Sequence, residues 1–101
     1  MDKIVNSTAN MKRIDLYGGK VKTFSSIKGH EAVSIVLIKP GKYDLGKASC
    51  DGTITVIEGT VFINGLMIEE SRKLTIRKGE ETKVRTEDVA VYLMETNKYR
   101  R

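Results

Sequence analysis

A glycine-punctuated run between residues 41 and 65, GKYDLGKASCDGTITVIEGTVFING, constrains the fold of this chain more than any other segment. It ends in Asn64-Gly65, which stands between two short apolar runs, residues 61–63 and 66–68. An Asn-Gly pair in this setting is the strongest short-range signal of a β-hairpin, because a type I′ turn needs positive φ at both central residues. The run therefore predicts short strands joined by tight turns.

Extended segments separated by turns recur along the rest of the chain. Residues 39–42 predict a turn, because Pro40 presets φ at the first corner and Gly41 tolerates the second. Residues 32–38 are almost continuously apolar and β-branched, which is typical of a strand buried on both faces. Further strands are expected at 21–24, 43–48, 53–57, 60–63, 66–68, 73–76, 82–85 and 89–94. Turns at this spacing predict an all-β sandwich or barrel.

The 101 residues suffice for one domain. We expect a polar N-terminal arm over residues 1–14, a β-barrel over 15–96 and a basic tail over 97–101. No long amphipathic pattern predicts a helix, and residues 69–72 are expected to form a loop. A closed barrel suits a small all-β chain, because closure removes the exposed sheet edges that promote aggregation.

The composition bounds the class of protein. Hydrophobic residues make up 40% and charged residues 31%, as in soluble globular domains. No apolar run approaches the roughly 20 residues that span a bilayer, the N-terminus lacks a signal-peptide pattern, and the single Cys50 fits a reducing cytosol. We therefore predict a cytoplasmic protein without a membrane partner.

The net charge of +5 arises partly from the basic tail, while the other basic residues alternate with acidic ones. That scatter argues against a nucleic-acid partner, which would favour a concentrated basic stripe. A barrel that binds nucleic acid or protein through a basic face is the least favoured of three functional hypotheses.

Several short motifs together resemble the cupin barrel and, more narrowly, the small one-domain cupins of the pyrimidine/purine nucleoside phosphorylase family. The motifs are Tyr17-x-Gly19-Lys20-Val21-Lys22, Gly41-x-Tyr43, Ala48, Thr55-Val56-Ile57-x-Gly59 and Tyr92-Leu93. The resemblance covers residues 17–79 and the last strand. It implies a single-domain cupin-like antiparallel β-barrel (a double-stranded β-helix or jelly roll), a homodimer, and metal-independent phosphorolysis of nucleosides to free base and pentose 1-phosphate, which is a glycosyl transfer.

Two departures from that family lie near the C-terminus. Only residues 80–91 separate Gly79 from Tyr92, where the family has a longer segment with an extra strand. Met94 stands where the family tends to have cysteine. A strand that helps to close the pocket is therefore expected to be shortened or missing, which threatens activity more than fold.

Metal chemistry is not expected, and neither is another cofactor. The positions at which metal-binding cupins carry their ligands fall near Lys47, Ser49 and residues 51–53, and a lysine and a serine cannot replace imidazoles around a transition metal. His30 is the one histidine and is expected to be a solvated turn residue. Cys50 has no evident base beside it and is expected to be a small, semi-buried side chain.

Phosphorolysis needs donors that hold phosphate and groups that hold the nucleoside. Lys47, Ser49 and backbone amides near Gly52 are expected to form a polar cluster at the barrel mouth. Asp51 could bind ribose hydroxyls, and Arg85 is the best guanidinium candidate. Tyr43 or Tyr92 could stack on a base, and no residue is assigned a catalytic role. For each of these residues the alternative is an ordinary surface or core position.

Two functions therefore stand close together. The favoured one, on the strength of the family, is a metal-independent nucleoside phosphorylase. The alternative is a non-catalytic barrel that binds a nucleotide-like or other anionic small ligand, which the shortened segment 80–91 motivates.

Overall fold

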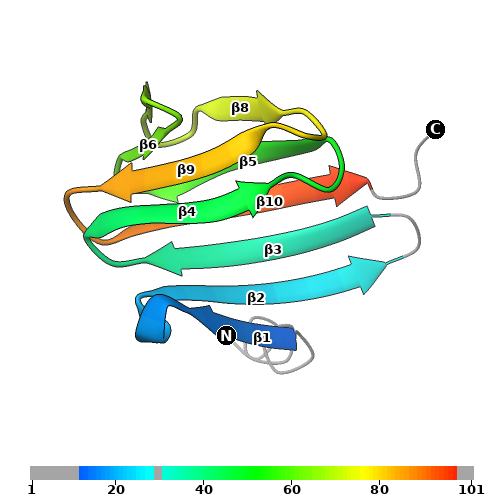
Figure 1. Ribbon diagram of the computed structural model, residues 1–101, viewed down its shortest axis with the longest axis horizontal. Coiled ribbons are helices and arrows are strands. Elements are labelled where there is room, and N and C mark those ends of the chain that lie inside the picture. Colours follow the sequence, from blue (N-terminus) through cyan, green and yellow to red (C-terminus); the bar gives the residue numbers. More distant parts are fainter. Residues whose placement is uncertain (1–11, 29–30, 98–101) are drawn as a thin grey trace.

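The computed structural model describes residues 12–28 and 31–97, and within them the chain is built almost entirely of strands (Figure 1). A single 3-10 turn, η1 (Tyr17–Gly19), joins the first two strands. The strands are β1 (Lys12–Leu16), β2 (Val21–Lys28), β3 (Glu31–Ile38), β4 (Gly41–Lys47), β5 (Gly52–Glu58), β6 (Val61–Ile63), β7 (Leu66–Ile68), β8 (Lys73–Ile76), β9 (Glu81–Thr86) and β10 (Ala90–Asn97).

The strands form two antiparallel sheets that pack face to face. The larger sheet has six strands in the order β1-β2-β3-β10-β5-β8, and the smaller has four in the order β4-β9-β6-β7. In Figure 1 β4 and β9 lie in front of β10 and β5. Because side chains alternate across a strand, each sheet turns one set of residues towards the other sheet and the second set outward.

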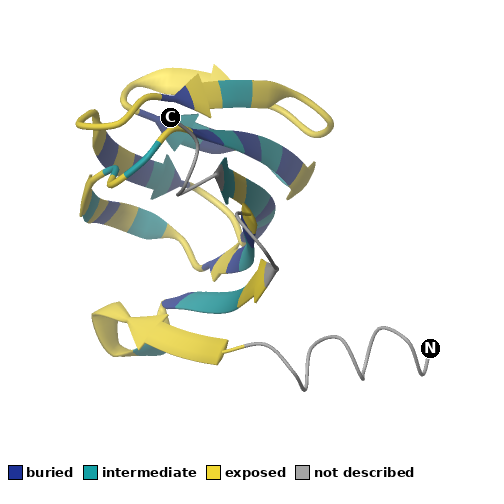
Figure 2. Cartoon of the chain, turned by 90° about the vertical axis from the view of Figure 1, so that its right-hand side faces the viewer, coloured by how far each residue is buried: buried dark blue, intermediate teal, exposed yellow. Residues whose placement is uncertain are grey.

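The interface between the sheets is an apolar core. Figure 2 shows buried and partly exposed bands alternating along the central strands. The fully buried side chains come from both sheets: Val21, Ile38, Ile54, Val56, Ile63, Ile76, Val84 and Tyr92 are among them. Burial of such side chains is the main stabilising term of a small domain, at about 1.5–3 kcal/mol for each large one.

Most expected strands are confirmed with shifts of a few residues, and so are the all-β class and the loop at 69–72. Asn64 and Gly65 have φ of 52° and 83°, as the type I′ hairpin requires, and Val61–Ile63 pairs with Leu66–Ile68. The segment 80–91 retains a strand, β9, which pairs with both β4 and β6.

One expectation about β3 is wrong. This strand buries only the face that carries Val36 and Ile38, whereas Leu37 on the opposite face is 37% exposed. The continuous apolar pattern reflects an outer sheet face that no described element covers.

The division into arm, barrel and tail stays a prediction, because residues 1–11 and 98–101 lie outside the described part. The strand β1 begins at Lys12, on the arm side of the expected boundary, and pairs with β2 through Leu16. Its mixed sequence indicated at most a weak strand or a turn of helix, since its stability comes from pairing with β2 and not from a buried face.

Replacing Gly41 with alanine is expected to lower the free energy of unfolding by about 2–3 kcal/mol. Gly41 has a φ of +147°, and an added Cβ would lie 2.8 Å from the Tyr43 hydroxyl oxygen. That hydroxyl donates to the turn before β4, at the carbonyl oxygens of Lys39 (2.8 Å) and Pro40 (3.0 Å). Urea denaturation measures the effect. The control is Gly46→Ala, where φ is +83° but nothing lies within 4 Å of the added Cβ; equal losses in the two variants would contradict the collision with Tyr43.

Candidate functional site

A hollow of about 440 Å³ lies on the smaller sheet and is open to solvent. Strands β4, β6 and β9 contribute most of its lining, and the β6–β7 turn contributes Gly65. The lining residues are Lys42, Tyr43, Asp44, Phe62, Gly65, Lys83, Val84 and Arg85. The core residues Tyr43 and Val84 belong to the inward set, so the outward side chains Lys42, Asp44, Phe62, Lys83 and Arg85 give the hollow its chemistry.

Strand register brings the charged and aromatic side chains together. Arg85 is the direct cross-strand partner of Lys42 on β4 and of Phe62 on β6, so the three residues form one row across the sheet. Lys83 and Asp44 form the neighbouring row. Cross-strand neighbours on one face have Cβ atoms about 5 Å apart, so both rows lie within reach of one small ligand.

The guanidinium of Arg85 lies over the Phe62 ring, with 4.0 Å between its central carbon and the ring centroid. A cation–π contact of this kind contributes about 0.5–1 kcal/mol at an exposed site and restrains the long side chain. Arg85 also approaches Glu87, with 3.6 Å between Nη1 and Oε2. Since 77% of the Glu87 side chain is exposed, this pair is weak and can be exchanged for a bound anion.

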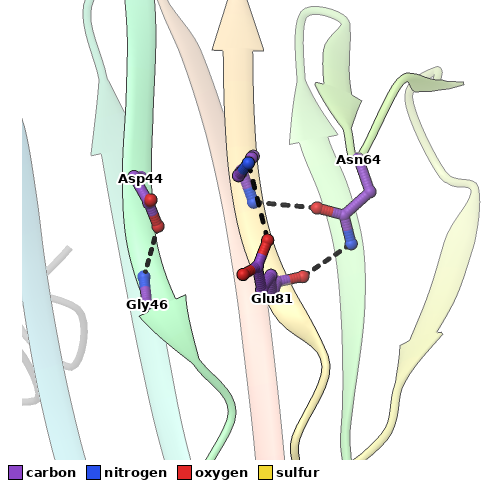
Figure 3. Close-up of polar contacts among 5 residues, drawn as sticks. Asp44, Gly46, Asn64 and Glu81 are labelled. Atoms are coloured by element: carbon purple, nitrogen blue, oxygen red, sulfur yellow. Dashed lines mark hydrogen bonds and ion pairs between the residues drawn. The ribbon is translucent and has the colours of Figure 1, made fainter.

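The second row is fixed by a network of polar contacts around the hairpin turn (Figure 3). Asn64 accepts a hydrogen bond from the Lys83 backbone (2.9 Å) and donates through its side-chain amide to the Glu81 carbonyl (2.7 Å). The Lys83 ammonium lies 3.5 Å from the Glu81 carboxylate. On the other side of the hollow, one carboxylate oxygen of Asp44 accepts from the Gly46 backbone (2.9 Å). The rim is therefore held by the backbone, while the ammonium groups keep freedom to move.

Lys42 is the cation best placed to meet an anion. The ion pairs formed within residues 12–28 and 31–97 do not include it. With Lys83 and Arg85 it gives the hollow three positive groups against the single carboxylate of Asp44 in the lining.

The expected site at the end of the barrel is only partly assembled. Lys47 ends β4 opposite Glu81, and Ser49 follows it in an exposed turn. The Asp51 carboxylate accepts a hydrogen bond from the Lys78 backbone (2.8 Å), so it stabilises the turn between β8 and β9. These three residues lie at one end of the molecule, and their roles in binding stay a prediction.

The other predicted site residues lie elsewhere. Arg85 pairs with Lys42, five residues before Lys47 on β4, so it is about 15 Å along the strand from that end. Tyr92 is 1% exposed in the core and has no free ring face for a base to stack on. Tyr43 is also buried, with its hydroxyl bonded to the preceding turn, although it borders the hollow. The six residues therefore do not form one site.

Four outward side chains of the hollow were not singled out from the sequence: Lys42, Asp44, Phe62 and Lys83. The available signal was alternation, because Lys42-x-Asp44 and Lys83-x-Arg85 place polar groups on the face opposite the core residues Tyr43 and Val84. The missing information was the pairing of β9 with both β4 and β6, which alternation alone does not supply.

The described residues offer neither a cluster of metal ligands nor a membrane-spanning helix. No group of three or more His, Cys, Asp and Glu side chains within that part of the chain is arranged to hold a metal ion. None of its helices has the length and apolarity needed to cross a membrane. His30 lies outside the described residues, and Cys50 is half-buried.

Comparisons with known proteins identify the fold. No family model and no curated protein matches the chain. Among solved structures, a protein of unknown function from Vibrio parahaemolyticus superposes with a TM-score of 0.76 at 20% identity, covering 85% of this chain and 97% of that one. A DUF1255 protein of unknown function from Acinetobacter gives 0.71 at 12% identity, over 84% and 89% of the two chains.

A third solved structure, an RmlC-like cupin from Shewanella frigidimarina, gives a TM-score of 0.69 at 12% identity and covers 91% of this chain and 87% of that one. The chain therefore has a small all-β cupin fold, as its motifs suggested. At these identities the likeness extends to the fold alone.

Proposed function

We propose that this cupin barrel binds a small anionic, nucleotide-like ligand in the hollow on β4, β6 and β9, without converting it. The single observation that carries the proposal is that Lys42, Lys83 and Arg85 line one hollow in which the Arg85 guanidinium lies over the aromatic ring of Phe62. Positive groups beside an aromatic surface suit a ligand that joins a phosphate to a planar base.

Each group has a defined part in this binding mode. The ammonium groups of Lys42 and Lys83 hold the phosphate, because they are the mobile cations of the two rows. The base stacks on the free face of the Arg85 guanidinium, whose other face rests on Phe62. Asp44 has a second carboxylate oxygen, beyond the one bonded to Gly46, which accepts from a sugar hydroxyl.

The open shape of the hollow supports binding more than catalysis. Glycosyl transfer needs a site that excludes water from the developing positive charge on the sugar. The hollow lies on an outer sheet face and cannot bury a ligand deeply. We therefore expect its ligand to bind with a dissociation constant in the micromolar to millimolar range.

Calorimetric titration tests the proposal with a matched set of probes: AMP, adenosine and inorganic phosphate. AMP is expected to bind at least tenfold more tightly than either of the others, because it engages both the cations and the stacked guanidinium. Its affinity is also expected to fall as salt rises from 50 to about 300 mM, through screening of the exposed charges. Equal binding of adenosine and AMP, or no heat at millimolar AMP, would refute the proposal.

Nucleoside phosphorolysis is the second candidate. It is supported by the resemblance of residues 17–79 to that family and by the exposed Lys47 and Ser49 at the end of the barrel. Incubation with inosine or uridine and phosphate, with a chelator present, would release free base and pentose 1-phosphate if this candidate is correct. Release that is lost in Lys47→Ala and kept in Lys42→Ala would favour phosphorolysis over the binding proposal.

A further inference from the structure

The outer face of the larger sheet carries an apolar band. Cross-strand register aligns Phe24 on β2, Ile35 on β3 and Leu93 on β10 in one row, and Leu37 and Val91 lie in the next. All five belong to the outward set, opposite the core residues Val36 and Tyr92. Leu37 is 37% exposed, and the other four are half-buried. We call this surface the outer band.

No element of the described chain packs on the outer band, and only the Arg13 guanidinium of β1 reaches its edge, 5.8 Å from the Phe24 ring centroid. All ten strands belong to the two sheets, and η1 contacts only β1 and β2 among the elements with substantial contacts. The smaller sheet packs on the opposite side, where Ile38, Ile54 and Tyr92 meet Tyr43 and Val84. A contiguous apolar surface of this kind on a soluble domain marks an interaction site.

Charges at the two ends of one row indicate the partner. The row runs Lys22, Leu37, Val91, Glu58 across β2, β3, β10 and β5. The cation Lys22 and the anion Glu58 each lie one strand away from the central apolar pair, Leu37 and Val91. Asp15 also faces Lys22 from β1, but Asp15 is held by Arg13, with hydrogen bonds of 3.0 and 3.2 Å. Glu58 is exposed and enters none of the ion pairs formed within the described residues.

We propose that a second copy of this chain docks on the outer band, related by a two-fold axis parallel to the strands. Rotation about such an axis places each row of one copy opposite the same row of the other copy, with the strands in reverse order. Lys22 of one copy then faces Glu58 of the other, twice, and Leu37 faces Val91. An axis perpendicular to the strands would place β2 opposite β2 and lose both ion pairs. A self-complementary patch is what a two-fold interface requires.

The available area predicts a small interface and a weak dimer. At about 3.3 Å per residue and about 4.8 Å between strands, the larger sheet offers on the order of 600 Å² of face, which is below the roughly 800 Å² that a standard interface takes from each partner. Glu95 and Ser26 lie one row beyond Phe24 and Leu93 towards the strand ends and form the polar rim. The hollow on the smaller sheet stays free on the opposite side of each copy.

Sedimentation equilibrium of the whole chain, from about 1 to 200 µM, tests the docking. The wild type is expected to be dimeric at the upper concentrations, and Leu93→Glu is expected to be monomeric throughout. The control is Leu66→Glu on the β6–β7 hairpin, where the side chain is 55% exposed and remote from the outer band. Circular dichroism melting identifies a variant that fails to fold. A monomeric wild type at 200 µM, or a Leu66→Glu effect equal to that of Leu93→Glu, overturns the proposal.

Exchanging the charges of Lys22 and Glu58 tests the direction of the two-fold axis. Both substitutions lie outside the hydrophobic core, so they are not expected to disturb folding. Lys22→Glu alone and Glu58→Lys alone are each expected to weaken dimerisation by about tenfold, because two attractive pairs become repulsive. The double variant Lys22→Glu/Glu58→Lys is expected to recover the wild-type dissociation constant within about threefold. Losses that add in the double variant overturn the strand-parallel axis.

Discussion

Replacing Tyr92 with alanine is expected to lower the free energy of unfolding by about 3–5 kcal/mol, the usual cost of removing a large aromatic side chain from a core. Tyr92 is 1% exposed, and its direct cross-strand neighbours are Val36 on β3 and Val56 on β5, so its ring fills the centre of the larger sheet's inner face. Since small domains have a total stability of about 5–15 kcal/mol, much of it is lost. Urea denaturation followed by circular dichroism measures the change.

Tyr92→Phe separates the ring from its hydroxyl. None of the hydrogen bonds within the described residues uses this hydroxyl, so the variant is expected to be as stable as the wild type at pH 7, or more stable by up to about 1 kcal/mol. A loss of 2 kcal/mol or more in Tyr92→Phe would contradict this account, because it would show that the hydroxyl has an essential partner.

Comparison of the wild type with Tyr92→Phe is also expected to reveal a pH dependence of the free energy of unfolding. Burial raises the pKa of the Tyr92 phenol well above its ordinary value of about 10, so the folded state keeps a proton that the unfolded state releases. The stabilising effect is therefore complete below pH 10 and is lost as the pH rises above 10 towards the folded pKa. The expected loss is about 1.4 kcal/mol per pH unit in that window. Denaturation between pH 9 and 11.5 should show this loss in the wild type and a smaller one in Tyr92→Phe; identical slopes would contradict the assignment.

Reversing two charges of the hollow is expected to have the largest effect on binding. The double variant Lys42→Glu/Arg85→Glu should weaken AMP binding by about 100-fold or more, since each charge-assisted contact contributes about 1.5–3 kcal/mol. Both positions lie on the outward face, so the core is untouched. Calorimetric titration measures the affinity, and thermal melting verifies the fold.

The matched control is Lys47→Glu on the same strand. It makes one such charge reversal, where the double variant makes two, about 15 Å along β4 from Lys42, and it should alter AMP affinity by less than about threefold. A larger loss in Lys47→Glu than in the double variant would place the ligand at the end of the barrel, where the sequence first suggested it.

The strands and their turns were predictable because local patterns determine them. The Asn64-Gly65 turn and the alternation around Tyr43 and Val84 are written into a few adjacent residues. The strand β1 was not predictable in this way: all five of its residues are exposed, and pairing with β2 is what holds it. The apolar run in β3 was ambiguous for a related reason, because an uncovered apolar face and a covered one have the same sequence pattern.

The candidate site was harder to predict, because its residues meet only through pairing between distant strands. Arg85 was expected at the barrel mouth beside Lys47, but it lies about 15 Å along β4 from that end. Its neighbours Lys42 and Phe62 follow from the register of β9 with β4 and β6. Tyr92 was considered for stacking because it matched a motif. Its position between Val36 and Val56 explains instead why a tyrosine-sized ring is needed there for packing.

Titration of ¹⁵N-labelled protein with AMP, followed by two-dimensional amide spectra, tests whether the ligand binds in the hollow on β4, β6 and β9. We expect the largest shift changes at the amides of Lys42, Phe62, Lys83 and Arg85, and we expect them to saturate together. Changes centred on Ser49 and Asp51 at the barrel end, or on core positions such as Ile54, would contradict this placement of the ligand.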